Sequence, residues 1–460
     1  MLPKKLIPSV IALVIVVACA APKPAPTTAE IVAKALPSTT DISAGWAAAM
    51  SKGVVEDGWL QSFEDPRLEA LAAEVLRNSP VLRIAAANVE RAAAAARQAG
   101  ANLAPVVSIG GGAGTSQRGN IDTQTSGVAL NVGWELDVWG RLSAAAAAAE
   151  ASYQGIESDF EYGRQSLIAQ TAKAWFLATD ARQQEMLAQE AVDIYTQLLE
   201  IAMVRENVGR ASAQDVYLAR ADQSSAEERL RFAHGAYEQA LRSIELMLGR
   251  YPSAELEANE DFVPVPPAIP IGVPSALLER RPDIVAAERR IAAAFQRTES
   301  AKAAKLPRIG LSLTGGRSSS ELIDLVGADQ NFWSAGANFV LPIDIGGGLQ
   351  AQVDINTAEQ EAAVAAYGQA ALRAFGEVEQ ALSNESLMEE REAFLSSVVE
   401  DNTRAYEASK AQYDVGKVDM LSLLQMQARV IGSRAALVHM KSARLAQRVD
   451  LHLALGGSFE

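Results

Sequence analysis

Residues 128–141, Val-Ala-Leu-Asn-Val-Gly-Trp-Glu-Leu-Asp-Val-Trp-Gly-Arg, decide the fold of this chain. Every second side chain from Val128 to Val138 is apolar, and those between them are small, polar or acidic. Because residues i and i+2 share a face of a strand, this pattern predicts a strand with one apolar face. Residues 140–207 then contain no proline and are rich in good helix formers. At 1.5 Å per residue they predict a helix on the order of 100 Å long.

Three more segments alternate in the same way, although the first of the four is rich in glycine. Such segments are typical of outer-membrane barrel strands, while a half-buried sheet on a soluble core would show the same alternation. Four strands cannot close a barrel, because the smallest have about 8 and lipid does not tolerate open edges. The count therefore predicts an oligomer, with eight strands from two copies or twelve from three. The predicted strands cover about residues 105–116, 127–138, 308–317 and 332–342.

The chain also repeats itself. Leu103-Ala104-Pro105, where a helical pattern gives way to a strand, is echoed 202 residues later by Lys305-Leu306-Pro307. Asn207-Val208-Gly209-Arg210 is echoed 207 residues later by Asp414-Val415-Gly416-Lys417. Each half is predicted to contain a helix, two strands, a very long helix, a glycine-centred break and another helix. The predicted repeats are residues 46–251 and 275–457, with a proline-rich linker at 252–274 and later helices at 140–207, 211–249, 347–414 and 418–455.

The N-terminus predicts an exported protein. Lys4 and Lys5 precede a short apolar run that ends at Ala18, which is typical of a signal peptide over residues 1–18. Cys19 is the only cysteine, so neither an intrachain disulfide nor a cysteine metal cluster is possible. The site resembles a bacterial lipobox, which implies cleavage before Cys19, a lipid on its sulfur and, with Ala20 following, the outer membrane. An ordinary signal peptide is the alternative. Residues 19–45 are predicted to form a flexible lipidated segment.

Composition and charge exclude several classes of function. Removing residues 1–18 takes away two lysines and no acid, so the net charge falls from −15 to −17, which argues against nucleic-acid binding. No later segment has 18 consecutive apolar residues, so no transmembrane helix is predicted. The three histidines, His234, His439 and His452, are predicted to serve packing or the surface. Without a nucleophile elbow or phosphate loop, we expect no enzyme, no metal site and no cofactor beyond the lipid.

Four motifs are found at Gly58–Leu68, Gly133–Arg141, Leu277–Ile284 and Leu341–Asp344. Together they resemble those of the outer-membrane efflux lipoproteins of the TolC/OprM/NodT type, the outer-membrane partners of RND-type pumps. The resemblance runs from about residue 46 to Gly457. In the fourth motif the expected phenylalanine is missing and a glycine stands in place of arginine. The first motif contains Trp59, Phe63, Asp65 and Pro66, the third contains Arg280-Arg281-Pro282-Asp283, and the fourth is followed by Gly346-Gly347-Gly348.

This resemblance implies a mixed α and β membrane protein that forms a homotrimer. Its twelve pooled strands would form one outer-membrane barrel, continued into the periplasm by a long α-helical barrel. The implied function is a passive exit duct for drugs or other small molecules. Its partners would be a periplasmic adaptor and an inner-membrane pump of the RND type. The strand-to-helix junctions of the barrel are predicted at Trp134, Trp139, Gly140, Pro342 and Gly347.

The two glycine breaks are predicted to form the periplasmic tip, because each long helix leaves the strands and turns back there. In the family this tip is both the pore gate and the adaptor-docking surface. We expect charged residues just past each turn to hold the gate closed, the alternative being that they are solvated turn residues. Gln425 stands where relatives often carry an aspartate, which would weaken an acidic ring. The predicted tip residues are Gly209, Asp215, Arg220, Gly416, Asp419 and Gln425.

Other functions share this architecture. A type I protein-secretion conduit and a heavy-metal duct are alternatives, and Met420 and Met426 would suit soft metals or, more simply, core packing. A coiled-coil envelope lipoprotein without a pore is a more remote alternative. Glu135 and Asp137, on the polar face of a strand, predict a mild preference for cations. The sequence does not identify the cargo.

Overall fold

The computed structural model describes residues 23–36, 46, 57–119, 121–269, 274–319 and 331–460. They belong to two compact units, which we treat separately. The sheet unit consists of the described residues within Met1–Thr40, Ala86–Asp159 and Asp283–Ala370. The hairpin unit consists of those within Asp41–Ala85, Phe160–Pro282 and Ala371–Glu460. Each unit draws on both halves of the sequence, so the sequence repeats do not coincide with the compact units.

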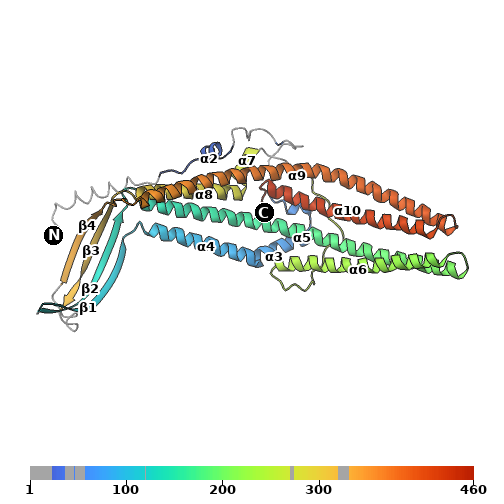
Figure 1. The fold of residues 1–460 in the computed structure, drawn as a ribbon, viewed down its shortest axis with the longest axis horizontal. Helices are drawn as coiled ribbons and strands as arrows, with labels where there is room; N and C mark the ends of the chain where they lie inside the picture. Colours follow the sequence, from blue (N-terminus) through green and yellow to red (C-terminus); the bar gives the residue numbers. More distant parts are fainter. Residues whose placement is uncertain (1–22, 37–45, 47–56, 120, 270–273, 320–330) are drawn as a thin grey trace. The chain divides into compact units, whose positions relative to one another are not determined.

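The two halves contain the same elements in the same order (Figure 1). Helices α4 and α8 have 22 residues each, α5 and α9 have 67, and α6 and α10 have 35. Within the described ranges, no helix combines the length and the apolar character needed to cross a membrane. The first half has α3 (Pro66–Asn78), α4 (Pro80–Ala101), β1 (Val106–Arg118), β2 (Ile121–Leu136), α5 (Arg141–Asn207) and α6 (Ala213–Met247), and the second has α7 (Pro274–Arg280), α8 (Pro282–Ala303), β3 (Arg308–Ser319), β4 (Asn331–Val340), α9 (Gly348–Asp414) and α10 (Met420–Ala454).

The four strands form one antiparallel sheet in the order β1-β2-β3-β4, and β2 and β3 join the two halves of the chain. Directly opposed residues share a face of the sheet, so the register merges the four alternating patterns into one apolar face. Strand β2 begins six residues before the predicted 127, because its backbone stays paired with β1 where the apolar alternation has already stopped. The apolar face carries Val107, Ile109, Val128, Leu130, Val132, Trp134, Leu136, Ile309, Leu311, Leu313, Trp333, Ala335, Ala337 and Phe339.

The opposite face of the sheet is small and polar. Asn131 of β2 and Thr314 of β3 are directly opposed, and the Thr314 hydroxyl donates a hydrogen bond of 3.1 Å to the Asn131 side-chain oxygen. Strands β1 and β4 each have only one neighbour in the sheet, so they form its two edges. Every residue of β4 is exposed on both faces. Among the residues that the structure describes, this sheet therefore has a largely exposed apolar face and two edges without a partner strand.

The hairpin unit is organised around Asp65, the acid of the first motif. Its side chain is only 3% exposed and accepts hydrogen bonds from the backbone of Arg67 and Leu68, which caps α3. It also accepts from the indole nitrogen of Trp175 on α5 and the side-chain amide of Asn259, each at 2.8 Å. One carboxylate thus ties α3, α5 and the linker to a core that contains Trp59, Phe63 and Phe176.

The proline-rich linker is held at both ends by buried charges. The Glu245 carboxylate, at the end of α6, accepts the backbone N–H groups of Ala254, Glu255 and Leu256 at 2.7, 2.9 and 3.1 Å. Arg448 of α10 donates to the carbonyl of Pro266 at 2.7 Å. These bonds satisfy backbone groups that cannot pair within a helix or sheet, because proline prevents both.

The N-terminal segment differs from its prediction. Residues 19–45 were expected to be flexible, but helix α2 (Thr28–Ala35) lies within them. Thr27 and Glu30 form a capping box that starts this helix, and Ile31 is buried. Lys23 connects this segment to α8. Its amine lies 2.6 Å from Glu299, and its backbone carbonyl accepts a hydrogen bond from the Gln296 side chain. Composition alone missed the helix because the three prolines before it hide its capping signal.

Candidate functional site

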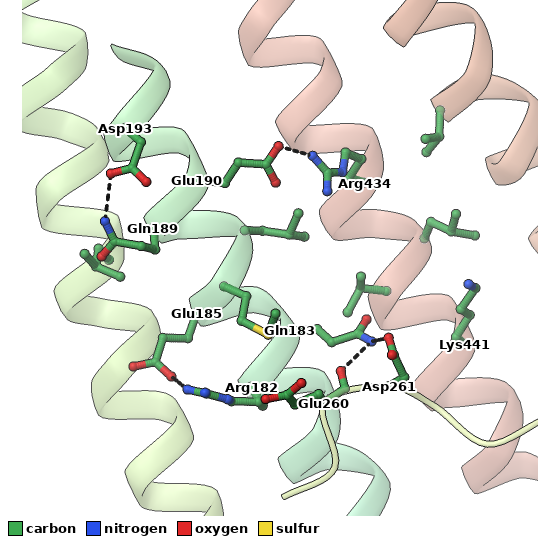
Figure 2. A pocket seen from close by; sticks show the side chains of 16 residues that line it. Arg182, Gln183, Glu185, Gln189, Glu190, Asp193, Glu260, Asp261, Arg434 and Lys441 are labelled. Atoms are coloured by element: carbon green, nitrogen blue, oxygen red, sulfur yellow. Dashed lines mark hydrogen bonds and ion pairs between the residues drawn. The ribbon is translucent and has the colours of Figure 1, made fainter. Parts of the chain in front are cut away.

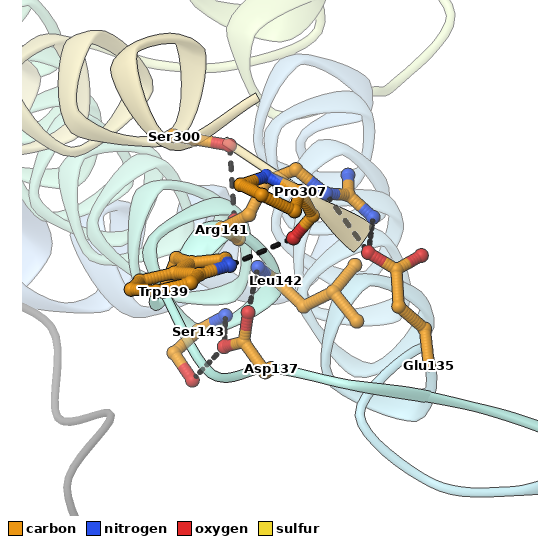
Figure 3. Close-up of polar contacts among 8 residues, drawn as sticks. All are labelled: Glu135, Asp137, Trp139, Arg141, Leu142, Ser143, Ser300 and Pro307. Carbon is orange, nitrogen blue, oxygen red and sulfur yellow. Dashed lines mark hydrogen bonds and ion pairs between the residues drawn. The ribbon is translucent and has the colours of Figure 1, made fainter. Parts of the chain in front are cut away.

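Asp137 builds the junction between β2 and α5 (Figure 3). Its carboxylate accepts the backbone N–H of Leu142 at 2.8 Å and that of Ser143 at 2.7 Å. These are among the N–H groups that the first turn of a helix leaves unpaired, and a negative charge there also favours the helix dipole. Gly140 supplies the positive φ of 73° that lets the chain turn between strand and helix.

Two tryptophans and an ion pair complete this junction. The Trp139 indole donates to the Pro307 carbonyl at 2.7 Å, and the Trp134 indole donates to the Leu103 carbonyl at 2.9 Å. Both accepting residues belong to the repeated segments that precede β1 and β3. Arg141 is paired with Glu135 at 2.8 Å. Because Asp137 caps a helix and Glu135 is neutralised by Arg141, the two acids no longer support the predicted cation preference.

The second half builds its junction in the same way, 207 residues later. Asp344 accepts the backbone N–H of Gln350 at 2.9 Å, and hydrogen bonds from the first turn of α9 hold the pKa of Asp344 below its usual value. Gly347 has a φ of 74° and α9 begins at the next residue. Pro342 lies two residues after the end of β4, where its missing N–H disturbs no strand pairing.

The two glycine breaks form matching turns in the hairpin unit. Gly209 and Gly416 have φ values of 70° and 77°, which L residues rarely adopt. After each glycine the next N–H reaches back five residues, from Arg210 to the Arg205 carbonyl and from Lys417 to the Gln412 carbonyl. This bonding pattern ends α5 and α9 as a Schellman motif and reverses the chain.

The predicted gate acids serve the ends of their own helices. Asp215 accepts the Ser212 backbone N–H at 2.9 Å in a capping box that starts α6. Asp419 caps α10 by accepting the Ser422 N–H at 2.8 Å, and its bonds to Ser422 lower its pKa. Arg220 and Gln425 are exposed. Across the described ranges, no hydrogen bond or ion pair connects these four predicted residues to one another.

The contact that does join the two turns was not predicted. Arg205, near the end of α5, donates to the Tyr413 carbonyl at 3.0 Å, and its guanidinium lies 3.9 Å from the centre of the Tyr413 ring. Tyr413 is 4% exposed and belongs to a core formed by α5, α6, α9 and α10. Burial is the main cause that raises the pKa of Tyr413. Sequence gave no signal for this pair, because its members lie 208 residues apart.

A pocket of about 830 Å³ in the hairpin unit is lined by residues of α5, α6, α9, α10 and the linker (Figure 2). Its polar rim is largely self-paired. Glu190 of α5 lies 2.7 Å from Arg434 of α10, and Arg182 lies 2.9 Å from Glu185. Gln183 donates to the Glu260 carbonyl at 2.9 Å. These contacts connect α5, α10 and the linker.

Two of the three histidines contact carboxylates, and the third is buried against an aromatic ring. His234 contacts Glu185 at 2.7 Å, and His439 contacts Asp180 at 3.0 Å. His452 is buried against the Trp59 ring, and burial lowers its pKa to about 3, so it is neutral at physiological pH. Among the described residues, no three His, Cys, Asp or Glu side chains are grouped so that they could hold a metal ion. Cys19 lies outside the described residues.

The chain is similar to known proteins over most of its length. A family model described as outer membrane efflux protein matches residues 71–250 and 273–457. A probable efflux pump outer membrane protein TtgC of Pseudomonas putida is 30% identical over 421 residues, covering 88% of this chain and 86% of that protein. The pyoverdine export outer membrane protein OpmQ of Pseudomonas aeruginosa is 28% identical over 418 residues, 87% of each. The solved outer-membrane channel OprN is 26% identical with a TM-score of 0.83, covering 92% of this chain and 99% of that one.

Proposed function

Because this chain belongs to the outer membrane efflux protein family, we propose that three copies of it close into one outlet for small molecules. The chain is an outer-membrane channel protein of efflux pumps and not an enzyme. Its fold, with four strands, long helices and two repeated halves, is that of the solved family members. The finer proposals concern how copies assemble, how the protein is anchored, what it conducts and what closes it.

The sheet is the observation that supports a closed oligomer, and the family resemblance supports three copies. In the part of the chain that the structure describes, it has two edges without a partner strand and a largely exposed apolar face, and an outer-membrane strand needs lipid on one side and paired neighbours on both edges. A second copy that pairs its β1 with β4 of the first removes one edge of each. Three copies close the sheet with twelve strands, which leaves the polar face lining a lumen wide enough for water.

The helices of the hairpin unit offer a matching interface. Phe232 on α6 and Phe394 on α9 are large apolar residues that are 75% and 70% exposed within one chain. Phe232 lies 19 residues after the start of α6, and Phe394 lies 20 residues before the end of α9. Both helices meet their turns at those ends, so the two rings lie at nearly the same height. We propose that α6 of one copy packs against α9 of the next and covers both phenylalanines.

A disulfide between copies tests this assembly. In the Phe232→Cys/Phe394→Cys variant, oxidation is expected to link neighbouring copies into a covalent trimer on a denaturing gel, because the two side chains meet across the interface. The oxidised trimer should still conduct ions in planar bilayers, whereas an envelope spacer would not.

The pair Phe232→Cys/Leu387→Cys serves as the control. Leu387 is also exposed on α9 but lies seven residues, or about 10 Å, further along the same face. That pair is expected to remain uncrosslinked. Monomers from both variants, or a ladder that ends at the dimer, would contradict a closed trimer.

Anchoring is proposed through a lipid on Cys19. The observation that supports it is the lipobox-like sequence Val16-Val17-Ala18-Cys19 at the end of the predicted signal peptide. Cells fed radioactive palmitate are expected to label the wild-type chain and not the Cys19→Ser variant. Label on the variant would exclude this anchor.

The cargo and the pump partners are proposed from the relatives. Their names refer to efflux of toluene, export of pyoverdine and efflux of cations, so we propose a small molecule delivered by an inner-membrane pump, of the RND type, through a periplasmic adaptor. A heavy-metal duct gains little support from Met420, which is buried in the core of the turns. A type I secretion conduit shares the architecture. An RND-type pump gene beside this one would favour efflux, and an ATP-driven exporter gene would favour secretion.

The turns at Gly209 and Gly416 are proposed as the adaptor-docking tip. Val208 and Val415 flank them and are 65% and 69% exposed, so both turns present apolar side chains. We propose that the closed state depends chiefly on Arg205, with Asp215, Arg220 and Asp419 as secondary contributors.

A further inference from the structure

The sheet unit contains a second cavity, of about 550 Å³, with an unusual charge. It lies between the first turns of α5, the last turns of α8, and parts of α4 and α9. Three arginines line it, namely Arg91, Arg141 and Arg297, and no aspartate or glutamate does. The whole chain has more acidic than basic residues and a net charge of −15, so a cavity lined by three arginines and no acid differs clearly from the average composition of the chain.

The three guanidinium groups differ in the hydrogen-bond and ion-pair partners that they have among the described residues. Arg141 is paired with Glu135, which lies outside the lining. Arg297 donates only to a neutral group, the Ser152 hydroxyl, at 2.9 Å. Arg91 has no hydrogen bond or ion pair to any part of the chain that the structure describes. The cavity is therefore lined by two exposed arginines, Arg91 and Arg297, that form no ion pair with an acid among the residues that the structure describes.

The remaining walls are apolar with a few neutral donors. Seven alanines and Ile156 make up half of the sixteen lining residues, and Gln352 and Asn356 of α9 add amide groups. The volume falls within the range of about 300–1,000 Å³ that is usual for small-molecule sites. Arginine forks match phosphate and carboxylate oxygens, and the alanines would cover a short hydrocarbon tail.

We infer that this pocket binds an amphipathic anion, with a phosphate or carboxylate head between Arg91 and Arg297 and an apolar tail along the alanines. The anion could come from either of two sources, an anionic phospholipid headgroup or a soluble exported solute, and the chemistry is the same. The inference is independent of the proposed gate and of the number of copies, since all the lining belongs to one chain.

Octyl phosphate is a suitable probe, because it carries both parts of such a ligand. Titration calorimetry of the full chain in a non-ionic detergent is expected to show binding to the wild type. The Arg91→Gln/Arg297→Gln variant should bind at least about 10-fold more weakly, because it loses two charge-assisted contacts. Arg97→Gln, on the exposed surface of the same helix and outside the pocket, should bind as the wild type does.

Two further measurements complete the test. Octyltrimethylammonium, with the same tail and the opposite charge, should not bind. In nanodiscs, weaker octyl phosphate binding with phosphatidylglycerol than with phosphatidylcholine would identify the lipid headgroup as the occupant, and equal binding would identify a soluble anion. Equal affinity of the double variant and the wild type, or tight binding of the cationic probe, would overturn the inference. Circular dichroism of each variant confirms that it is folded.

Discussion

Replacement of Asp65 by alanine is expected to lower the free energy of unfolding by about 4 kcal/mol. The carboxylate is almost fully buried and accepts four hydrogen bonds, from the backbone of Arg67 and Leu68 and from the side chains of Trp175 and Asn259. Alanine would leave the buried Trp175 indole N–H without an acceptor and remove the N-cap of α3. A small loss of packing would add to these polar losses.

Urea denaturation of the purified protein, followed by circular dichroism, measures this effect. Asp401→Ala removes an exposed aspartate of α9 and should change the free energy of unfolding by less than about 0.5 kcal/mol. Asp65→Asn retains one acceptor oxygen and should fall between the wild type and Asp65→Ala. A stability of Asp65→Ala close to that of Asp401→Ala would show that the four hydrogen bonds contribute little.

Replacement of Arg205 by alanine is expected to open the tip. The side chain joins the end of α5 to that of α9 through a charged hydrogen bond and a stacked guanidinium, together worth about 2 kcal/mol. If these contacts exist only in the closed state, their loss shifts the equilibrium between closed and open about 30-fold. Single-channel recordings in planar bilayers should then show more frequent high-conductance events, and cells should admit more of a bulky antibiotic.

Two variants separate this contact from charge alone. Arg205→Lys keeps the charge but loses the planar fork and the stacking, so its conductance should lie between those of the wild type and Arg205→Ala. Arg210→Ala removes an exposed arginine of the adjacent turn and should leave conductance unchanged. If Arg205→Ala and Arg210→Ala give the same conductance, the contact between Arg205 and Tyr413 does not hold the pore closed.

The strands and their faces were predictable because their signals are local. The alternation from Val128 to Val138 requires only that neighbouring side chains point to opposite faces, and the register of β2 confirms the apolar set. The family, the fold class and the efflux function followed from the four motifs, and the comparisons confirm them. The lipid on Cys19 stays a prediction, because Cys19 lies outside the described residues. The gate residues also stay predictions.

Side-chain roles were harder to predict than elements. Asp215 and Asp419 were chosen for their position beside the turns, but each carboxylate is bound to the first turn of its own helix. Glu135 and Asp137 were expected to leave charge free on the polar face of a strand, whereas one is paired and the other caps a helix. In both cases the sequence did not show the local hydrogen-bond and ion-pair partners of these acids.

The sequence by itself determined the elements, their order and their duplication, because helix propensity, strand alternation and glycine turns act over a few residues. Tertiary structure alone decided which distant side chains meet, as Arg205 does with Tyr413 and Asp65 with Trp175. The physical reason is geometric. Each residue turns a helix by about 100° and advances it by about 1.5 Å, so contact between two helices depends on rotation and height that no local pattern records. The strand alternation that begins at Val128 and the long helix after it could therefore be predicted from the sequence. The contact of Arg205 with Tyr413, near the far end of that helix, could not.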